Sequence, residues 1–262
     1  MFFMVGGMPR AGSRMYFFLI EELMFAAGHP NSIELREKLG DKLPPRTINH
    51  YFQLPQLLAF NRAAQDTNTL FAIRTHKGLT LTGRALIRVG RMRGAYVYRD
   101  PRDVIVSALE RGRIMRESGN AERYFGIGPY RTFARLKTLK GGLRWFKYQQ
   151  FDRWKRWSSC PNILMSRYED NISDPKKTLI SLREHFELDV PDEKLDAIAA
   201  PFFKPEEAVE KADYYTIKDT PGGGALKNKG VVGRFNETFS NEEIQLINDY
   251  LGDIIQKMGY EI

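Results

Sequence analysis

The sequence has very little that could cross-link the chain or carry it through a membrane. Among its 262 residues there is one cysteine, Cys160, so no intramolecular disulfide can form, which favours a reducing compartment. No stretch approaches the roughly 20 apolar residues that a membrane-spanning helix requires. The apolar start, residues 1–5, is too short for a signal-peptide core. We therefore expect a cytoplasmic protein without a membrane span.

Linkers, low-complexity tracts and internal repeats are also missing from the sequence. The apolar fraction of 42% is typical of a packed globular protein rather than a disordered one. We expect one domain over residues 1–262. The net charge of +8 indicates an anionic partner, which by charge alone could be a nucleic acid, a membrane surface or a polyanionic small molecule.

Short apolar runs alternate with helical segments along the chain. The run 2–5 predicts a buried strand, the runs 70–73, 95–98 and 163–165 predict three more strands, and residues 14–27 predict a buried helix. This alternation predicts an α/β fold of the P-loop-like kind, with a central parallel β-sheet flanked by helices. Ligands of such folds bind at the carboxyl ends of the strands.

Local signals mark the starts of three further helices. An acid followed by proline is typical of a helix N-terminus, and a serine with a glutamate three residues later forms a capping box. These signals are Asp100-Pro101, Asp174-Pro175, and Ser240 with Glu243. The stretches between the elements, at about 30–69, 111–143 and 200–232, predict irregular or helical insertions, and the first two are expected to line a ligand pocket with aromatic residues: Tyr51, Phe52, Phe60, Tyr124 and Phe125.

The first strand leads into a glycine loop suited to an anion. Gly7 and Gly12 have the G-x-x-x-x-G spacing of a phosphate loop, whose backbone N–H groups can surround an anion at a helix N-terminus. A nucleotide triphosphatase then needs Lys-Ser/Thr to hold phosphates and Mg²⁺, but here Ser13 and Arg14 follow. With Arg10 inside the loop, we expect an anion site that requires no metal. A glycine–arginine turn without a ligand is the alternative.

Two further segments carry candidate site residues. His76 follows the second strand between cationic neighbours, which favours a neutral ring suited to a general base; a surface histidine is the alternative. Arg99 ends the third strand and Ser107 lies about two turns into the next helix, so together they could hold a terminal phosphate. Alternatively, Arg99 pairs with Asp100 or Asp103.

Taken together, these segments resemble the sulfotransferases that use 3′-phosphoadenosine 5′-phosphosulfate (PAPS), particularly the cytosolic branch. The family's P-K-S-G-T-T-W loop is similar to residues 9–15, and its K-T-H to residues 74–76. Its Y-V-x-R-N-P-K-D-V-x-V-S is closely matched by residues 96–107. The family's Y-E-D resembles residues 168–170, and its closing R-K-G-x-x-G-D-W-K-x-x-F resembles residues 228–239.

The resemblance implies a PAPS site and a role for each matching residue. The 5′-phosphosulfate would lie on the loop, and Met15 stands where the family carries a tryptophan against adenine. The 3′-phosphate would be held from the third strand, its following helix and the closing motif. Tyr168 would approach the adenine, and His76 would take the acceptor's proton. The loop residues are Arg10, Ala11, Gly12, Ser13 and Arg14, and those of the 3′-phosphate site are Arg99, Ser107, Lys229 and Gly230.

The function expected from the resemblance is in-line sulfuryl transfer to a hydroxyl or amine of a small molecule. His76 would be the general base, with Arg10 stabilising charge on the departing phosphate; Glu21 or Glu22 are the alternative bases. One competing hypothesis is a P-loop kinase. The other is a non-catalytic module of the same fold that binds anions or nucleic acid, suggested by the basic-aromatic run over residues 144–157. Because aromatics at helical spacing usually pack in a core, nucleic acid is the less favoured partner.

Overall fold

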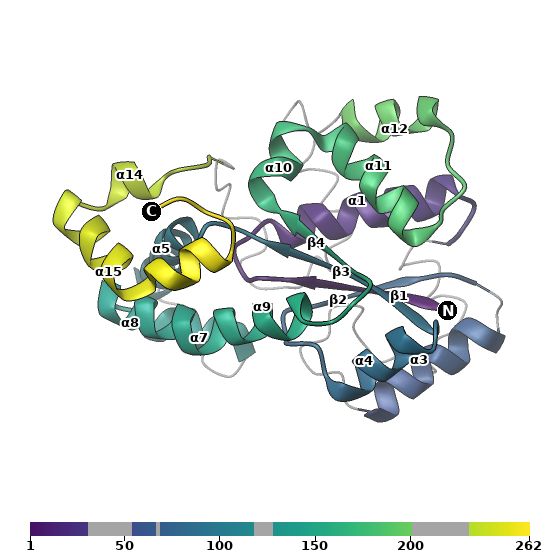
Figure 1. The fold of residues 1–262 in the computed structure, drawn as a ribbon, viewed down its shortest axis with the longest axis horizontal. Coiled ribbons are helices and arrows are strands. Elements are labelled where there is room, and N and C mark those ends of the chain that lie inside the picture. The colour runs from purple at the N-terminus through teal and green to yellow at the C-terminus, as the bar shows by residue number, and fades with distance from the viewer. Residues whose placement is uncertain (31–53, 67–68, 118–127, 201–230) are drawn as a thin grey trace.

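The computed structural model describes residues 1–30, 54–66, 69–117, 128–200 and 231–262 (Figure 1). Its centre is a four-stranded sheet with the order β2-β1-β3-β4, and every pair of neighbouring strands is parallel. The strands are β1 (Phe2–Gly7), β2 (Ala72–Thr75), β3 (Met92–Tyr98) and β4 (Ile163–Arg167). The predicted α/β class with a central parallel sheet is confirmed.

Helices cover both faces of this sheet (Figure 1). On one side lie α1 (Ser13–Ala26), α10 (Tyr168–Ser173), α11 (Pro175–Phe186) and α12 (Asp192–Ala199). The opposite side carries α3 (Leu54–Asp66), α4 (Leu81–Arg88) and α9 (Phe151–Ser158). Beyond the carboxyl ends of the strands lie five elements: α5 (Pro101–Glu117), α7 (Gly128–Arg135), α8 (Leu139–Trp145), α14 (Phe235–Thr238) and α15 (Asn241–Lys257).

The strand positions differ from the prediction mainly at β2. We predicted a strand at 70–73, but pairing with β1 places it at Ala72–Thr75, with Phe3 opposite Ala72 and Gly6 opposite Thr75. Arg74 and Thr75 are therefore buried strand residues, and His76 is the first residue beyond the strand. Hydrophobicity alone missed this shift because the polar residues at the end of β2 are buried by neighbours distant in sequence.

The predicted helix starts are confirmed by their hydrogen bonds. Asp100 Oδ1 accepts from the Arg102 amide at 2.8 Å, and Asp174 Oδ1 accepts from the Lys177 amide at 2.9 Å. Ser240 forms the expected capping box with Glu243. In each case the side chain satisfies an amide that has no partner within its own helix.

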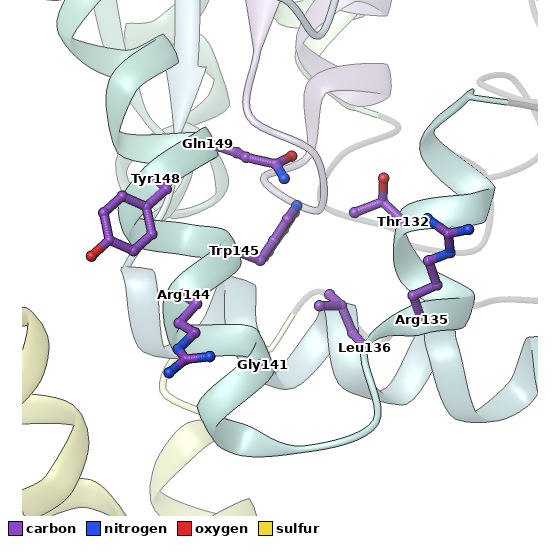
Figure 2. Close-up of a pocket in the computed structure, with 8 residues that line it drawn as sticks. All are labelled: Thr132, Arg135, Leu136, Gly141, Arg144, Trp145, Tyr148 and Gln149. Atoms are coloured by element: carbon purple, nitrogen blue, oxygen red, sulfur yellow. The ribbon is translucent and has the colours of Figure 1, made fainter.

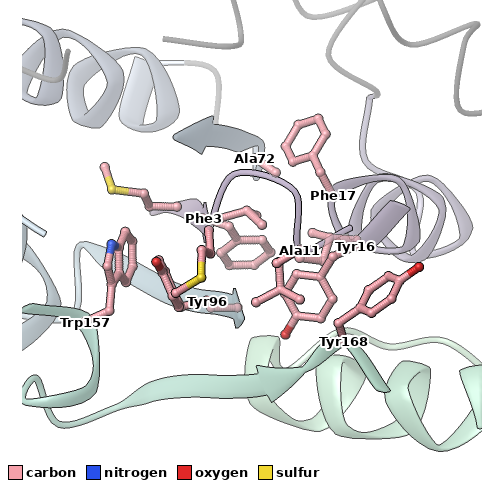
Figure 3. Close-up of a cluster of buried hydrophobic side chains, with 14 of the residues drawn as sticks. Phe3, Ala11, Tyr16, Phe17, Ala72, Tyr96, Trp157 and Tyr168 are labelled. Carbon is pink, nitrogen blue, oxygen red and sulfur yellow. The ribbon is translucent and has the colours of Figure 1, made fainter. Parts of the chain in front are cut away.

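Aromatic packing ties the end of β2 to α9. Trp157 is fully buried, stacks on Tyr96 with ring centroids 5.3 Å apart, and donates from Nε1 to the Lys77 carbonyl oxygen at 2.9 Å. Figure 3 shows Trp157 and Tyr96 on one side of the glycine loop and Tyr168 on the other. These contacts hold the residue that follows His76 against the central sheet.

The basic-aromatic run forms part of the core. Trp145, Phe146 and Trp157 are buried, whereas Lys155 and Arg156 are exposed. Between α8 and α9 the chain forms a π-helix, η2 (Phe146–Gln150), which the sequence did not predict. Among the described residues no helix combines the length and apolar character needed to cross a bilayer.

Candidate active site

The loop between β1 and α1 has the backbone of an anion-binding turn. Arg10 and Gly12 both adopt left-handed conformations, with φ of 72° and 69°. The Gly12 carbonyl accepts from the Tyr16 amide at 3.0 Å, and α1 starts at Ser13 with no side-chain cap in the described structure. The N-terminus of α1 thus faces the loop without a side-chain cap, and this end of a helix favours negative charge.

Tyr168 closes one side of this loop. A Cβ atom built on Gly12 would overlap the Tyr168 ring, so glycine is required here for space as well as for its positive φ. The Arg99 guanidinium packs over the same ring, with its central carbon 4.5 Å from the ring centroid. Tyr168 therefore connects the loop to the end of β3.

Arg10 connects the loop to α5. Its Nε donates to Ser107 Oγ at 2.9 Å across 97 residues of sequence. Burial and the nearby Arg111 guanidinium lower the pKa of Arg10 to about 10; Arg99 and Arg14 add to this effect, and Glu110 opposes it. An arginine in so positive an environment is stabilised by a bound anion.

Arg99 is buried at the other end of the site, with 5% of its surface exposed. Its Nη2 donates to Asp103 Oδ2 at 2.7 Å and to the Val231 carbonyl oxygen at 2.5 Å. Its Nε is buried and has no hydrogen-bond partner among the described residues. A buried charged donor without a partner is costly, so this atom fits a place for a phosphate oxygen.

The alternative pairing of Arg99 was therefore correct in part. Arg99 pairs with Asp103, while Asp100 pairs with Arg102 at 2.7 Å. The contacts with Asp103 and Val231 are both made by Nη2, so they leave the Nε atom for a ligand. The internal ion pair is therefore compatible with an anion bound at Nε.

His76 lies where β2 ends and beside the start of the glycine loop. It is half-buried, and its Nδ1 lies 2.7 Å from the Gly7 carbonyl oxygen. A carbonyl can only accept, so Nδ1 carries the proton and the lone pair of the neutral ring is on Nε2. Glu21 is buried eight residues into α1, about 12 Å along the helix from Ser13. That distance favours His76 as the base.

The structure brings most of the predicted site residues together. Direct contacts join Arg10 to Ser107, Arg99 to Tyr168, and His76 to the loop. Of the other loop residues, Ala11 and Ser13 are buried and Arg14 and Met15 are half-buried at the start of α1. Lys229 and Gly230 lie outside the described residues. No cluster of His, Cys, Asp or Glu that could hold a metal ion occurs in the described ranges.

Sequence reasoning missed two features of the site. Arg111 is a buried cation that acts on Arg10 from α5. Asp103 lies in the first turn of α5, but it also accepts a hydrogen bond from the Gly233 amide. No local signal could have indicated this contact, because it joins residues 130 positions apart in the sequence.

A hollow of about 590 Å³ lies between α7 and the α8–η2 segment (Figure 2). Leu136 and Trp145 form its buried part, and the exposed side chains of Arg135 and Arg144 stand at its edges. Four aromatics that we predicted for an acceptor pocket lie outside the described residues: Tyr51, Phe52, Tyr124 and Phe125. Phe60, the fifth, packs against Phe2 and Phe71 and belongs to the core.

Comparison with known proteins adds a family and a fold. The family model described as a sulfotransferase domain matches residues 4–259. The amine sulfotransferase of Oryctolagus cuniculus is 27% identical over 156 residues, which cover 56% of this chain and 49%, about half, of that protein.

Solved structures show the same fold. Retinol dehydratase in complex with androsterone and the inactive cofactor PAP aligns with a TM-score of 0.59 and 18% identity, covering 100% of this chain and 82% of that one. A mouse sulfotransferase complexed with PAP aligns with a TM-score of 0.58 and 16% identity, covering 98% and 87%.

Proposed function

The chain belongs to the sulfotransferase domain family, and from this membership we propose that it transfers the sulfuryl group of PAPS to a hydroxyl or amine of a small molecule. When bound, PAPS supplies an activated sulfuryl group on a phosphate leaving group. The residues of this chain then have three tasks: to hold the two anionic ends of PAPS, to take up the charge of the leaving group, and to remove the acceptor's proton.

The observation that carries the proposal is the pair of anion positions joined across the site. One is the N-terminus of α1 with Arg10, and the other is Arg99 at the end of β3, whose buried Nε has no hydrogen-bond partner among the described residues. The bond from Arg10 to Ser107 joins the loop to α5, and the Tyr168 ring lies against both Gly12 of the loop and the Arg99 guanidinium. Two linked cationic positions suit a nucleotide that carries an anion at its 5′ end and another at its 3′ position.

In this arrangement Arg10, with the loop and helix amides, would stabilise the charge that develops on the departing phosphate. Ser13 and Arg14 would add to the 5′ position, and Met15 and Tyr168 would contact the adenine. Lys229 and Gly230 are proposed, from the family motif alone, as further contacts to the 3′-phosphate. No step of this proposal requires a metal ion.

His76 is the proposed general base. The carbonyl of Gly7 orients its ring and holds the proton on Nδ1, so Nε2 is the ring nitrogen that would take up the acceptor's proton. Gly7 is the first residue of the glycine loop, so this hydrogen bond fixes the position of the His76 ring relative to the loop. A fixed distance between the base and the proposed sulfuryl donor site favours transfer to an acceptor bound between them.

The acceptor is proposed by class only, as a small molecule with a hydroxyl or amine. Retinol and androsterone are bound by structural relatives, and the curated relative is named for amines. A cytoplasmic location and a single domain over residues 1–262 remain predictions.

The first test is calorimetric titration with 3′-phosphoadenosine 5′-phosphate (PAP) in the absence of metal, with ATP and Mg²⁺ as the comparison. We expect a clear preference for PAP. Arg99→Ala should weaken PAP binding about 10- to 100-fold, because a charged hydrogen-bond donor is lost from a buried position. Arg113→Ala, which removes an exposed arginine of α5, should leave PAP binding unchanged.

The alternatives predict different outcomes. Preference for Mg·ATP would indicate a P-loop kinase. No preference, together with tight and salt-dependent affinity for RNA, would indicate a non-catalytic binding module.

A further inference from the structure

Asp103 has an unusual set of partners for an acid beside an anion site. Its carboxylate is fully buried, with none of the side chain exposed. Oδ2 accepts from Arg99 Nη2 at 2.7 Å and from the Gly233 amide at 2.9 Å, and Oδ1 accepts from the Phe235 amide at 3.1 Å. One carboxylate thus joins the arginine at the end of β3 to chain about 130 residues later.

Besides the two bonds to Asp103, further contacts hold the segment 231–235 against Arg99 and α5. The Val231 carbonyl accepts from the same Arg99 Nη2, and Gly233 turns the chain with a φ of 78°. Phe235 lies under the Arg102 guanidinium at 4.2 Å, and Arg234 pairs with Glu110 at 3.1 Å. Asp103 is the residue of α5 that bonds both to this segment and to Arg99.

The charge of Asp103 works against an anionic ligand. A buried carboxylate next to Arg99 lowers the local positive potential, which by Coulomb's law alone weakens the binding of a phosphate. Geometry has the opposite effect. By engaging Nη2, together with the Val231 carbonyl, Asp103 restricts the arginine to one orientation and leaves Nε, which has no hydrogen-bond partner among the described residues, as a donor for a ligand.

We propose that Asp103 is a positioning residue of the anion site: it orients Arg99 and anchors segment 231–235 so that both meet the ligand in one fixed arrangement. The inference rests on the proposed function, because it takes the ligand to be the 3′-phosphate end of PAP or PAPS. If Asp103 loses its charge, the charge argument predicts tighter PAP binding and the geometric argument predicts weaker binding. The direction of the change in PAP affinity therefore tests the inference.

The test is Asp103→Asn with calorimetric titration of PAP. Asparagine keeps the shape of the side chain, but its NH₂ group would face a donor wherever it is placed, because every recorded partner of Asp103 is a donor. We expect PAP binding to weaken about 10-fold or more. Tighter or unchanged binding would overturn the inference, because then charge would dominate.

The matched control is Glu117→Gln on the same helix. Glu117 pairs with Arg113 at the same four-residue spacing, but both side chains are more than half exposed. Removing that carboxylate changes the net charge by the same amount without touching the site. PAP affinity should remain that of the unmodified protein.

A double-mutant cycle shows whether Asp103 acts through Arg99. In an Arg99→Ala background, Asp103→Asn should weaken PAP binding by less than it does in the unmodified protein, because one of the two groups that Asp103 positions is gone and only the anchoring of segment 231–235 remains. A full, additive loss in that background would show an independent effect and reject the positioning role. In turnover assays Asp103→Asn should raise KM for PAPS more than it lowers kcat, whereas general loosening of the fold would lower kcat as well.

Hydrogen exchange provides a second readout that does not depend on how well Asp103→Asn folds. In the unmodified protein the amides of Gly233 and Phe235 should exchange slowly, and more slowly still with PAP. Arg99→Ala should speed their exchange. Fast exchange of both amides in the unmodified protein would overturn the inference. If the unmodified protein does not bind PAP, the proposed function fails; if it binds PAP and Asp103→Asn binds equally well, only this inference fails.

Discussion

Gly12→Ala should damage both stability and ligand binding, through two separable effects. The first is backbone strain, since Gly12 has a φ of 69° and a left-handed conformation costs an L-residue about 1–2 kcal/mol. The second is steric, because the new methyl group would overlap the Tyr168 ring. Overpacking of this kind costs about 1–3 kcal/mol.

Gly28→Ala separates the two effects. Gly28 also has a positive φ, of 83°, but a Cβ built there meets nothing within 4 Å among the described residues. Both variants lose the same chain entropy in the unfolded state, so that contribution cancels between them. The free energy of unfolding should therefore fall by about 1–3 kcal/mol more for Gly12→Ala than for Gly28→Ala.

Urea denaturation gives the two unfolding free energies, and PAP titration gives the functional consequence. The Arg99 guanidinium packs over the Tyr168 ring, so displacement of that ring in Gly12→Ala should weaken PAP binding. Gly28 lies at the far end of α1, and its variant should bind PAP normally. Equal destabilisation of the two variants, or unchanged PAP binding in Gly12→Ala, would refute the close approach of Tyr168 to the loop.

Two further substitutions test the base and the C-terminal end of the chain. His76→Asn keeps a hydrogen-bond donor near the Gly7 carbonyl but removes the basic ring nitrogen. In an assay with an acceptor, kcat should fall about 10²–10⁴-fold, whereas PAP affinity should be nearly unchanged. A kcat within about tenfold of the original would show that another residue is the base. Tyr260→Phe removes a bond of 2.7 Å to Glu169 Oε2, and Glu169 Oε1 accepts from the Asp100 amide. Thermal unfolding should show a loss of about 2 kcal/mol, or about 4–8 °C in Tm. An unchanged Tm would show that the hydrogen bond from Tyr260 to Glu169 contributes nothing to the stability of the fold.

Much of the fold was readable from local sequence because its signals act over a few residues. The acid of Asp174-Pro175 and the pair Ser240 and Glu243 cap their own helices, with donor and acceptor three residues apart. The run 2–5 is apolar throughout because β1 lies between two other strands and is buried on both faces. Such signals depend little on the rest of the chain.

The strand ends and the insertions were less predictable. Arg74 and Thr75 are polar, yet β2 includes them because they pair with Val5 and Gly6 of β1. The π-helix Phe146–Gln150 has no local signature, since it depends on how α8 and α9 both pack. In these places packing by distant neighbours outweighed local preference.

For the candidate site, the sequence shows which residue types are present and in what order: a glycine loop with Arg10, a histidine after a strand, and Arg99 followed by Ser107. The contacts among them depend on the folded chain. The bond from Arg10 to Ser107 spans 97 residues, and those from Asp103 to Gly233 and Phe235 span 130 and 132. The physical reason is that parallel strands bring their carboxyl ends to one edge of the sheet, however far apart they lie in the chain.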